Sequence, residues 1–110
     1  MALTPEGKVK KLIDKFFDEH FPGAWKYNPP GGAFGKAGVP DKLFLYKGVM
    51  IAVEAKAVGG RPTKLQLINL KHLKEQGCIA AIVVGEDLDR LNLIKQAVHK
   101  ELANRGIANG

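Results

Sequence analysis

The sequence predicts an α/β sandwich, in which a central mixed sheet is flanked by helices on both faces. Two segments carry apolar residues at helical spacing, a capping box opens a third helix between them, and four short runs are rich in strand-forming residues. Strands that are apolar on both faces need helices on both sides of the sheet. The expected order is helix, short strand, hairpin, helix, strand and helix, which is an αβββαβ core followed by a C-terminal helix.

The first expected helix begins after Thr4, which can cap it. Pro5 then takes the first helical position and Glu6 lies in the first turn. Pro22-Gly23 ends the helix. Apolar and aromatic side chains recur between these limits at helical spacing, which predicts one face turned to the core. This stripe consists of Val9, Leu12, Ile13, Phe16, Phe17 and His20.

A short strand and a β-hairpin follow. The short strand is expected at residues 24–27. Residues 42–46 and 49–56 read as two strands, and Lys47-Gly48 between them indicates a two-residue turn. The central sheet is therefore expected to contain an antiparallel hairpin.

The second half of the chain predicts a helix, a strand and a helix. Thr63 and Gln66 have the spacing of a capping box, opening a helix that runs to Gln76. Residues 78–84 are a continuous apolar run, as expected for a buried strand. A last helix follows, with Asp87 as its cap and an apolar stripe of Leu88, Leu91, Ile94 or Lys95, Val98 and Leu102.

Size and charge point to one basic domain. With 110 residues, the chain is expected to form a single domain over residues 1–110. Lys and Arg total 17 against 11 Asp and Glu, a formal net charge of +6. Such a surplus favours a polyanionic partner, usually nucleic acid or an acidic membrane surface.

Targeting signals and cysteine chemistry are not expected. No apolar run is long enough to span a membrane, and the first residues lack the order of a signal peptide. Cys78 is the only cysteine, so the sequence predicts no disulfide framework and a reducing, cytoplasmic setting without secretion. His20, His72 and His99 lack the spacing of zinc ligands.

The hairpin register brings two carboxylates together. If Tyr46 faces Val49 across the turn, Asp41 lies directly opposite Glu54. Facing residues of an antiparallel pair have Cβ atoms roughly 4.5–5.5 Å apart on one face of the sheet. Lys56, two residues beyond Glu54, points to that face as well. The end of the sheet is therefore expected to hold two acids and an ammonium.

This cluster has the composition of a phosphoryl-hydrolysis site. Adjacent carboxylates at the edge of an apolar face repel each other, and a divalent cation relieves that repulsion. Oxygen ligands select hard ions such as Mg²⁺ or Mn²⁺. Lys56 can stabilise the charge that develops on a phosphate. Glu6 could reach the same metal or a water on it, and Gln66 opens the helix that follows the Lys56 strand.

Three motifs carry a resemblance to a known family. They are Gly38-Val39-Pro40-Asp41, Glu54-Ala55-Lys56 and Thr63-Lys64-Leu65-Gln66. With them the chain resembles the PD-(D/E)XK nuclease superfamily and looks most like its virus-type replication-repair (VRR-NUC) branch, over nearly its whole length. The resemblance implies a restriction-endonuclease-like α/β sandwich.

The resemblance also implies roles for individual residues. By analogy with the family, Asp41, Glu54 and the backbone carbonyl of Ala55 bind the metal, and Lys56 assists catalysis. Glu6 and Gln66 match the glutamate of the family's first helix and the glutamine after its motif. Stand-alone viral and bacterial members look like homodimeric endonucleases that act on branched DNA such as four-way (Holliday) junctions. The expected function is therefore a Mg²⁺- or Mn²⁺-dependent, structure-selective DNA endonuclease of replication and repair.

Each of these residues also has a structural explanation. Glu54 and Lys56 could form a solvated ion pair at a strand end, which stabilises little. Asp41 could be a turn residue, and Glu6 is favoured in a first helical turn by the helix dipole alone. Gln66 is explained at least as well by the capping box. The alternative functions are a catalytically silent nucleic-acid-binding module on this fold and a protein-interaction subunit.

Basic residues around these motifs are candidates for contact with DNA phosphates. The segment 31–36 is expected to be a loop; its glycines invite a phosphate-loop interpretation, but the spacing is one residue short, so no nucleotide cofactor is expected. Trp25 and Tyr27 are expected to pack in the core, although bases or a dimer interface would also suit them. The candidate DNA-binding residues are Lys8, Lys11, Lys36, Arg61 and Lys64.

Overall fold

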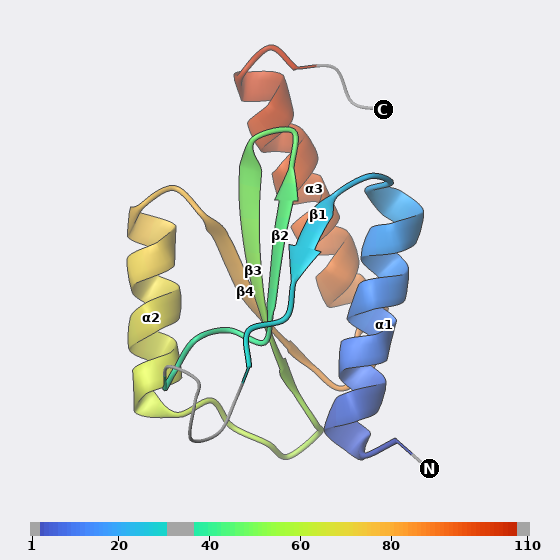
Figure 1. Ribbon diagram of the computed structural model, residues 1–110, viewed down its shortest axis with the longest axis vertical. Helices are drawn as coiled ribbons and strands as arrows, with labels where there is room; N and C mark the ends of the chain where they lie inside the picture. Colours follow the sequence, from blue (N-terminus) through green and yellow to red (C-terminus); the bar gives the residue numbers. More distant parts are fainter. Residues whose placement is uncertain (1–2, 31–36, 108–110) are drawn as a thin grey trace.

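The computed structural model describes residues 3–30 and 37–107. Its elements follow the expected order, so the αβββαβ core with its C-terminal helix is confirmed (Figure 1). Only the ends of elements differ from the expected bounds, by one or two residues. The elements are α1 (Pro5–His20), β1 (Trp25–Tyr27), β2 (Lys42–Tyr46), β3 (Val49–Lys56), α2 (Lys64–Glu75), β4 (Ile79–Val84) and α3 (Leu88–Asn104).

The sheet is mixed and has the order β1-β2-β3-β4. β2 pairs with β1 and with β3 in the antiparallel sense, whereas β3 and β4 are parallel. Tyr46 pairs with Val49 across the hairpin, as the sequence predicts. Both turn residues have positive φ, 49° at Lys47 and 85° at Gly48, which is the signature of a type I′ turn. This tight turn sets the register of the whole hairpin.

Helices cover the two faces of the sheet unequally. α1 and α3 pack together on one face and bury the larger core, which includes Phe17 stacked on Phe44 at 3.8 Å between ring centroids. α2 covers the other face over β3 and β4, where Leu70 packs with Ala52 and Ala80. Figure 1 shows α2 alone on its side of the sheet. The apolar stripes of the first and last helices are confirmed, except that Leu88 is exposed.

The helices and strands of the described residues leave the α2 side of β1 and β2 uncovered. Trp25 and Tyr27 face this side together with their partners on β2, and 54% and 47% of their surfaces are exposed. The expectation that they pack in the core is wrong, because β1 is an edge strand beyond the reach of α2. We call this surface the open sheet face; it consists of Trp25, Tyr27, Leu43, Leu45 and Met50.

Side-chain caps position the helices at one end of the sheet. Thr4 Oγ1 accepts a hydrogen bond from the N–H of Gly7, and Asp87 accepts one from the N–H of Arg90. Thr63 forms the expected capping box at α2. All three helices begin at the end of the sheet where β3 and β4 end (Figure 1), so their partially positive N-termini surround this end. None of the helices in the described part of the chain is long and apolar enough to cross a membrane.

Candidate metal centre and active site

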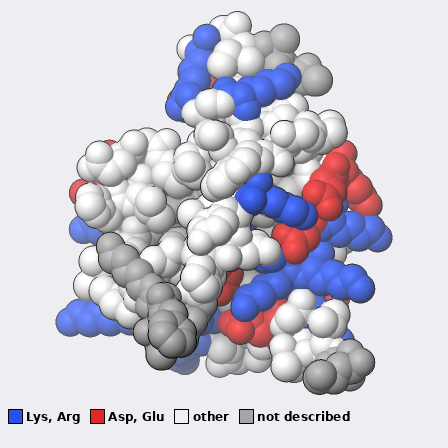
Figure 2. Space-filling view, in the orientation of Figure 1, with Lys and Arg blue, Asp and Glu red and all other residues white. Residues whose placement is uncertain are grey.

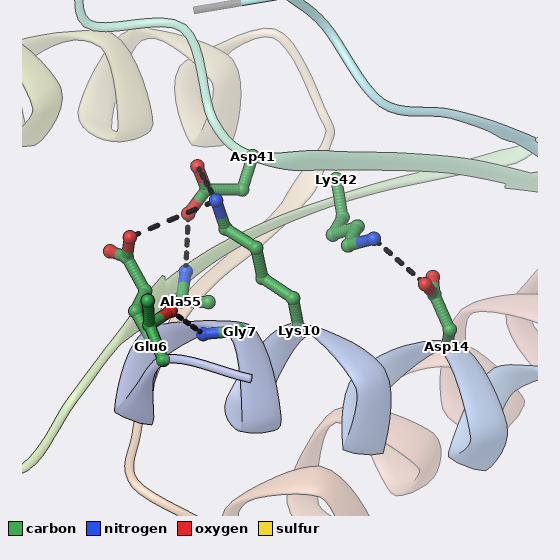
Figure 3. Close-up of polar contacts among 8 residues, drawn as sticks. Glu6, Gly7, Lys10, Asp14, Asp41, Lys42 and Ala55 are labelled. Carbon is green, nitrogen blue, oxygen red and sulfur yellow. Dashed lines mark hydrogen bonds and ion pairs between the residues drawn. The ribbon is translucent and has the colours of Figure 1, made fainter. Parts of the chain in front are cut away.

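Asp41 and Glu54 meet at the end of the sheet where the three helices begin. The hairpin register pairs Lys42 with Val53, so the preceding Asp41 lies opposite Glu54. Asp41 Oδ2 accepts a hydrogen bond of 2.9 Å from the N–H of Ala55 (Figure 3). Glu54 is only 1% exposed, between β2 and β4. The predicted facing of the two acids is therefore present in the fold.

The two carboxyls titrate very differently because they share one site. Burial, the hydrogen bond with Asp41 and the Asp41 charge raise the pKa of Glu54 to about 8. Burial also raises the pKa of Asp41, but the hydrogen bonds with Glu54 and with the Ala55 N–H outweigh it, so the net pKa is lowered. At neutral pH without a metal, the pair thus holds one proton and one negative charge.

The arrangement fits a divalent cation. Oε2 of Glu54 is buried and has no hydrogen-bond partner among the described residues. A cation beside this oxygen would replace the shared proton and satisfy it. No three His, Cys, Asp or Glu side chains of residues 3–30 and 37–107 gather closely enough to hold a metal. Two carboxylates completed by a backbone carbonyl, such as that of Ala55, and by water suit Mg²⁺, which keeps several waters.

Lysines and a further acid surround the carboxyl pair. Lys56 ends β3 on the same face as Glu54 and acts electrostatically on both carboxyls. The ammonium nitrogen of Lys10, on α1, lies 3.6 Å from Asp41 Oδ1 and 3.7 Å from Glu6 Oε2 (Figure 3). Glu6 is therefore close to the site, joined to it through Lys10. Its place as a direct metal ligand stays a prediction.

Gln66 is engaged in a structural role. Its Oε1 accepts a hydrogen bond of 2.8 Å from the Thr63 N–H, and its own N–H donates to Thr63 Oγ1 at 3.1 Å. The capping box is confirmed. The side-chain N–H₂ group is the part of Gln66 that remains for a catalytic role, which stays a prediction.

The candidate DNA-binding residues lie in exposed positions near the same end of the sheet. Lys8, Lys11, Arg61 and Lys64 are exposed. Lys8 also lines a cleft of about 220 Å³ with Ala57 and Val58, which follow β3 directly. Lys36 and the expected loop at 31–36 lie outside the described residues.

An ion pair that was not predicted from the sequence joins the start of β2, next to Asp41, to α1. Lys42 Nζ lies 2.8 Å from Asp14 Oδ2 of α1, and the Lys42 side chain is 6% exposed (Figure 3). Asp14 Oδ1 is buried without a partner among the described side chains. Lys42 directly follows Asp41, so this contact fixes the start of β2 against α1. The signal in the sequence is the spacing of Glu6, Lys10 and Asp14, which recur every four residues on one helix face.

Replacing Lys42 by Met is expected to lower the free energy of unfolding by about 2 kcal/mol, because it leaves Asp14 partly buried and unpaired. Chemical denaturation measures this change. Lys26→Met is the matched control, since Lys26 pairs with Asp18 at 3.5 Å but both side chains are exposed; it should change stability by less than about 0.5 kcal/mol. Equal losses in the two variants would show that the Lys42–Asp14 pair has no special weight.

Comparisons with known proteins agree with this architecture. The sequence matches no family model and no curated protein. Among solved structures, one described as a VRR_NUC domain is 25% identical, with a TM-score of 0.63, covering 84% of this chain and 96% of that one. Another, described as a VRR_NUC domain protein, is 20% identical at a TM-score of 0.63 and shows the same fold over 87% of this chain and 89% of its own.

Proposed function

The chain carries a VRR-NUC domain, which is a nuclease-family fold, and we propose that it is a divalent-metal-dependent endonuclease that hydrolyses phosphodiester bonds in DNA. One observation carries this proposal: the buried carboxyl of Glu54 faces Asp41 beside Lys56. A module that only bound DNA would gain nothing from buried acids facing phosphates, because like charges repel.

Each residue of the cluster has a task in the proposed reaction. Asp41, Glu54 and the Ala55 carbonyl would hold Mg²⁺ or Mn²⁺, which, when bound, polarises the phosphodiester and makes water a stronger nucleophile. The Ala55 N–H holds Asp41 in orientation through Oδ2. The Lys56 ammonium stabilises the negative charge that develops on the phosphate as the water attacks. Lys8, Lys11, Arg61 and Lys64 would contact phosphates on either side of the cut.

We further propose that two copies of the chain pair through the open sheet face. Figure 2 shows uncharged surface between α2 and β1, whereas charged side chains gather over α1. The rings of Trp25 and Tyr27 stack at 6.0 Å on this surface, and Leu45 beside them is 39% exposed. Large exposed apolar patches with aromatic residues mark protein interfaces. A groove of about 210 Å³ between α2 and β2 continues the surface, lined by Val39, Pro40, Leu43, Asn69, His72 and Leu73.

Trp25→Glu is expected to convert the dimer into a monomer, raising the dimer dissociation constant at least about a hundredfold, because it buries a charge at the centre of the interface. Sedimentation over a range of protein concentrations measures this constant. Leu93→Glu is the control, since Leu93 is 55% exposed on α3, away from the open sheet face. A wild type that stays monomeric at high concentration would contradict the interface.

A two-fold dimer would suit a branched, symmetric substrate. The experiment that tests the proposed activity offers the protein labelled four-way junction, flap, single-stranded and linear duplex DNA with Mg²⁺, Mn²⁺ or EDTA. We expect metal-dependent cleavage, fastest on branched DNA. Salt-dependent binding without cleavage in either metal would favour the silent binding module, and the absence of any DNA binding would favour a protein-interaction subunit.

A further inference from the structure

The ammonium of Lys10 lies between two acids at the edge of the proposed metal centre. It is 3.7 Å from Glu6 Oε2 and 3.6 Å from Asp41 Oδ1, and the three side chains converge in Figure 3. The two oxygens of Asp41 thus have different neighbours: Oδ2 accepts the Ala55 N–H, and Oδ1 faces Lys10. Among the described residues, Lys10 is the cation in ion-pair contact with Asp41 in the metal-free chain.

This contact disfavours a divalent cation on Asp41 Oδ1, the oxygen that does not accept the Ala55 N–H. Two positive charges within about 4 Å of each other repel strongly wherever the surroundings are partly buried. The Lys10 side chain is 38% exposed and flexible, whereas Asp41 is 22% exposed and held by the backbone of β3. When a metal binds the Asp41 carboxylate, Lys10 is therefore the group that moves.

We propose that Lys10 is an exchangeable cation of the active site, which occupies Asp41 before the metal binds and afterwards contacts a phosphate of the DNA backbone. The inference rests on the proposed nuclease function and adds a coupling between metal binding and DNA binding. Among the described residues, the acids in ion-pair contact with Lys10 are Glu6 and Asp41. Once a metal is bound to Asp41, a DNA phosphate replaces Asp41 as a negative partner of the Lys10 ammonium.

The position of Lys10 supports a phosphate as the second partner. Lys10 lies in the second turn of α1, one turn from the helix N-terminus, and the exposed Lys8 and Lys11 are close to it in the sequence. Helix N-termini and clustered lysines both favour phosphate groups. The scissile phosphate has to approach the Asp41 metal ligand, so the released ammonium lies beside its path.

Calorimetric titration with Mn²⁺ in the absence of DNA tests the first half of the exchange. Lys10→Met removes the competing charge and is expected to bind Mn²⁺ about five- to tenfold more tightly than wild type. Lys10→Arg keeps the charge and is expected to stay within about twofold of wild type. Lys100→Met removes a charge at the far end of α3 and is also expected to stay within about twofold. Unchanged or weaker Mn²⁺ binding by Lys10→Met would overturn the inference.

Fluorescence anisotropy with labelled four-way junction tests the second half of the exchange, in a Lys56→Met background in which cleavage is expected to be slow enough for binding to be measured. With Mn²⁺ present, Lys10→Met is expected to weaken DNA binding about fivefold and to lower the salt dependence by about one phosphate contact. With EDTA, where Lys10 stays on Asp41, the same substitution is expected to change DNA affinity by less than about twofold. Equal losses of DNA affinity with Mn²⁺ and with EDTA would show that Lys10 is an ordinary surface charge, and would overturn the exchange.

The proposed nuclease function and the Lys10 exchange can fail separately. If wild type binds no Mn²⁺, the proposed function fails and the exchange fails with it. If wild type binds Mn²⁺ and cuts DNA but Lys10→Met matches it in both assays, only the exchange is wrong.

Discussion

Replacing Lys56 by Met is expected to lower the single-turnover rate of DNA cleavage about a hundred- to a thousandfold. Lys56 ends β3 on the face that carries Glu54, and its charge reaches both carboxyls of the proposed metal centre. A fixed ammonium there stabilises charge that exists only as the phosphodiester bond breaks. Its loss should therefore reduce the rate far more than the affinity for DNA.

Rate and affinity are separated by measuring cleavage with enzyme in excess and DNA binding by anisotropy. Lys71→Met is the matched control, because Lys71 is exposed on α2, about two turns after the Thr63 cap. This variant should keep the wild-type rate within about twofold. Lys56→Arg, which keeps the charge but changes its geometry, should fall between the two. Cleavage within about tenfold of wild type in Lys56→Met would remove this residue from the mechanism.

Glu54→Gln is expected to abolish metal-dependent cleavage and, at the same time, to stabilise the metal-free protein at alkaline pH. The pKa of the buried Glu54 is about 8, against an ordinary value of 4.5. Between these two pH values the unfolded chain has lost the proton that the folded chain keeps. The free energy of unfolding therefore falls as pH rises from about 5 to about 8 and then levels off.

Glutamine cannot ionise, so the variant should lack this decline. Above pH 8 it should be more stable than wild type by about 2–4 kcal/mol. The pKa of Asp41 is lowered, so its contribution to the free energy of unfolding is lost as pH falls. This loss occurs only below about pH 4, outside the range of the experiment. Urea denaturation between pH 5 and pH 9 measures the difference. Glu75→Gln, on the exposed end of α2, is the control and should follow the wild-type curve.

Metal should narrow the difference in stability between the two proteins at alkaline pH. Mg²⁺ at about ten times its dissociation constant should stabilise wild type by about 1.4 kcal/mol and leave Glu54→Gln unchanged. If metal-free Glu54→Gln were less stable than metal-free wild type at every pH, the Glu54 carboxyl would stabilise the fold and would not be a group held ready for a metal.

The position of the carboxyl pair could be predicted from the sequence because a two-residue hairpin turn leaves little freedom. Lys47 and Gly48 adopt the type I′ geometry. Strand residues alternate between faces with a period of two, so the turn alone sets Asp41 opposite Glu54. The helix caps at Thr4, Thr63 and Asp87 were equally readable, since capping depends on residues three positions apart.

Contacts between elements could not be predicted in the same way. The pairing of Lys10 with Asp41 and of Asp14 with Lys42 depends on how α1 docks against the start of β2. No local pattern specifies that docking. The exposure of Trp25 likewise depends on how far α2 extends over the sheet, and α2 stops at β3 and β4.

The most direct test of the central claim is a comparison of wild type with Asp41→Asn on labelled four-way junction DNA in Mg²⁺, Mn²⁺ and EDTA. Asn keeps the size of Asp41 but removes the charge that the metal and Lys10 share. We expect cleavage by wild type in either metal, none in EDTA, and loss of cleavage in Asp41→Asn with its fold retained. Cleavage that persists in Asp41→Asn, or wild type that binds the junction and cuts it with neither metal, would contradict a metal-dependent nuclease site at Asp41.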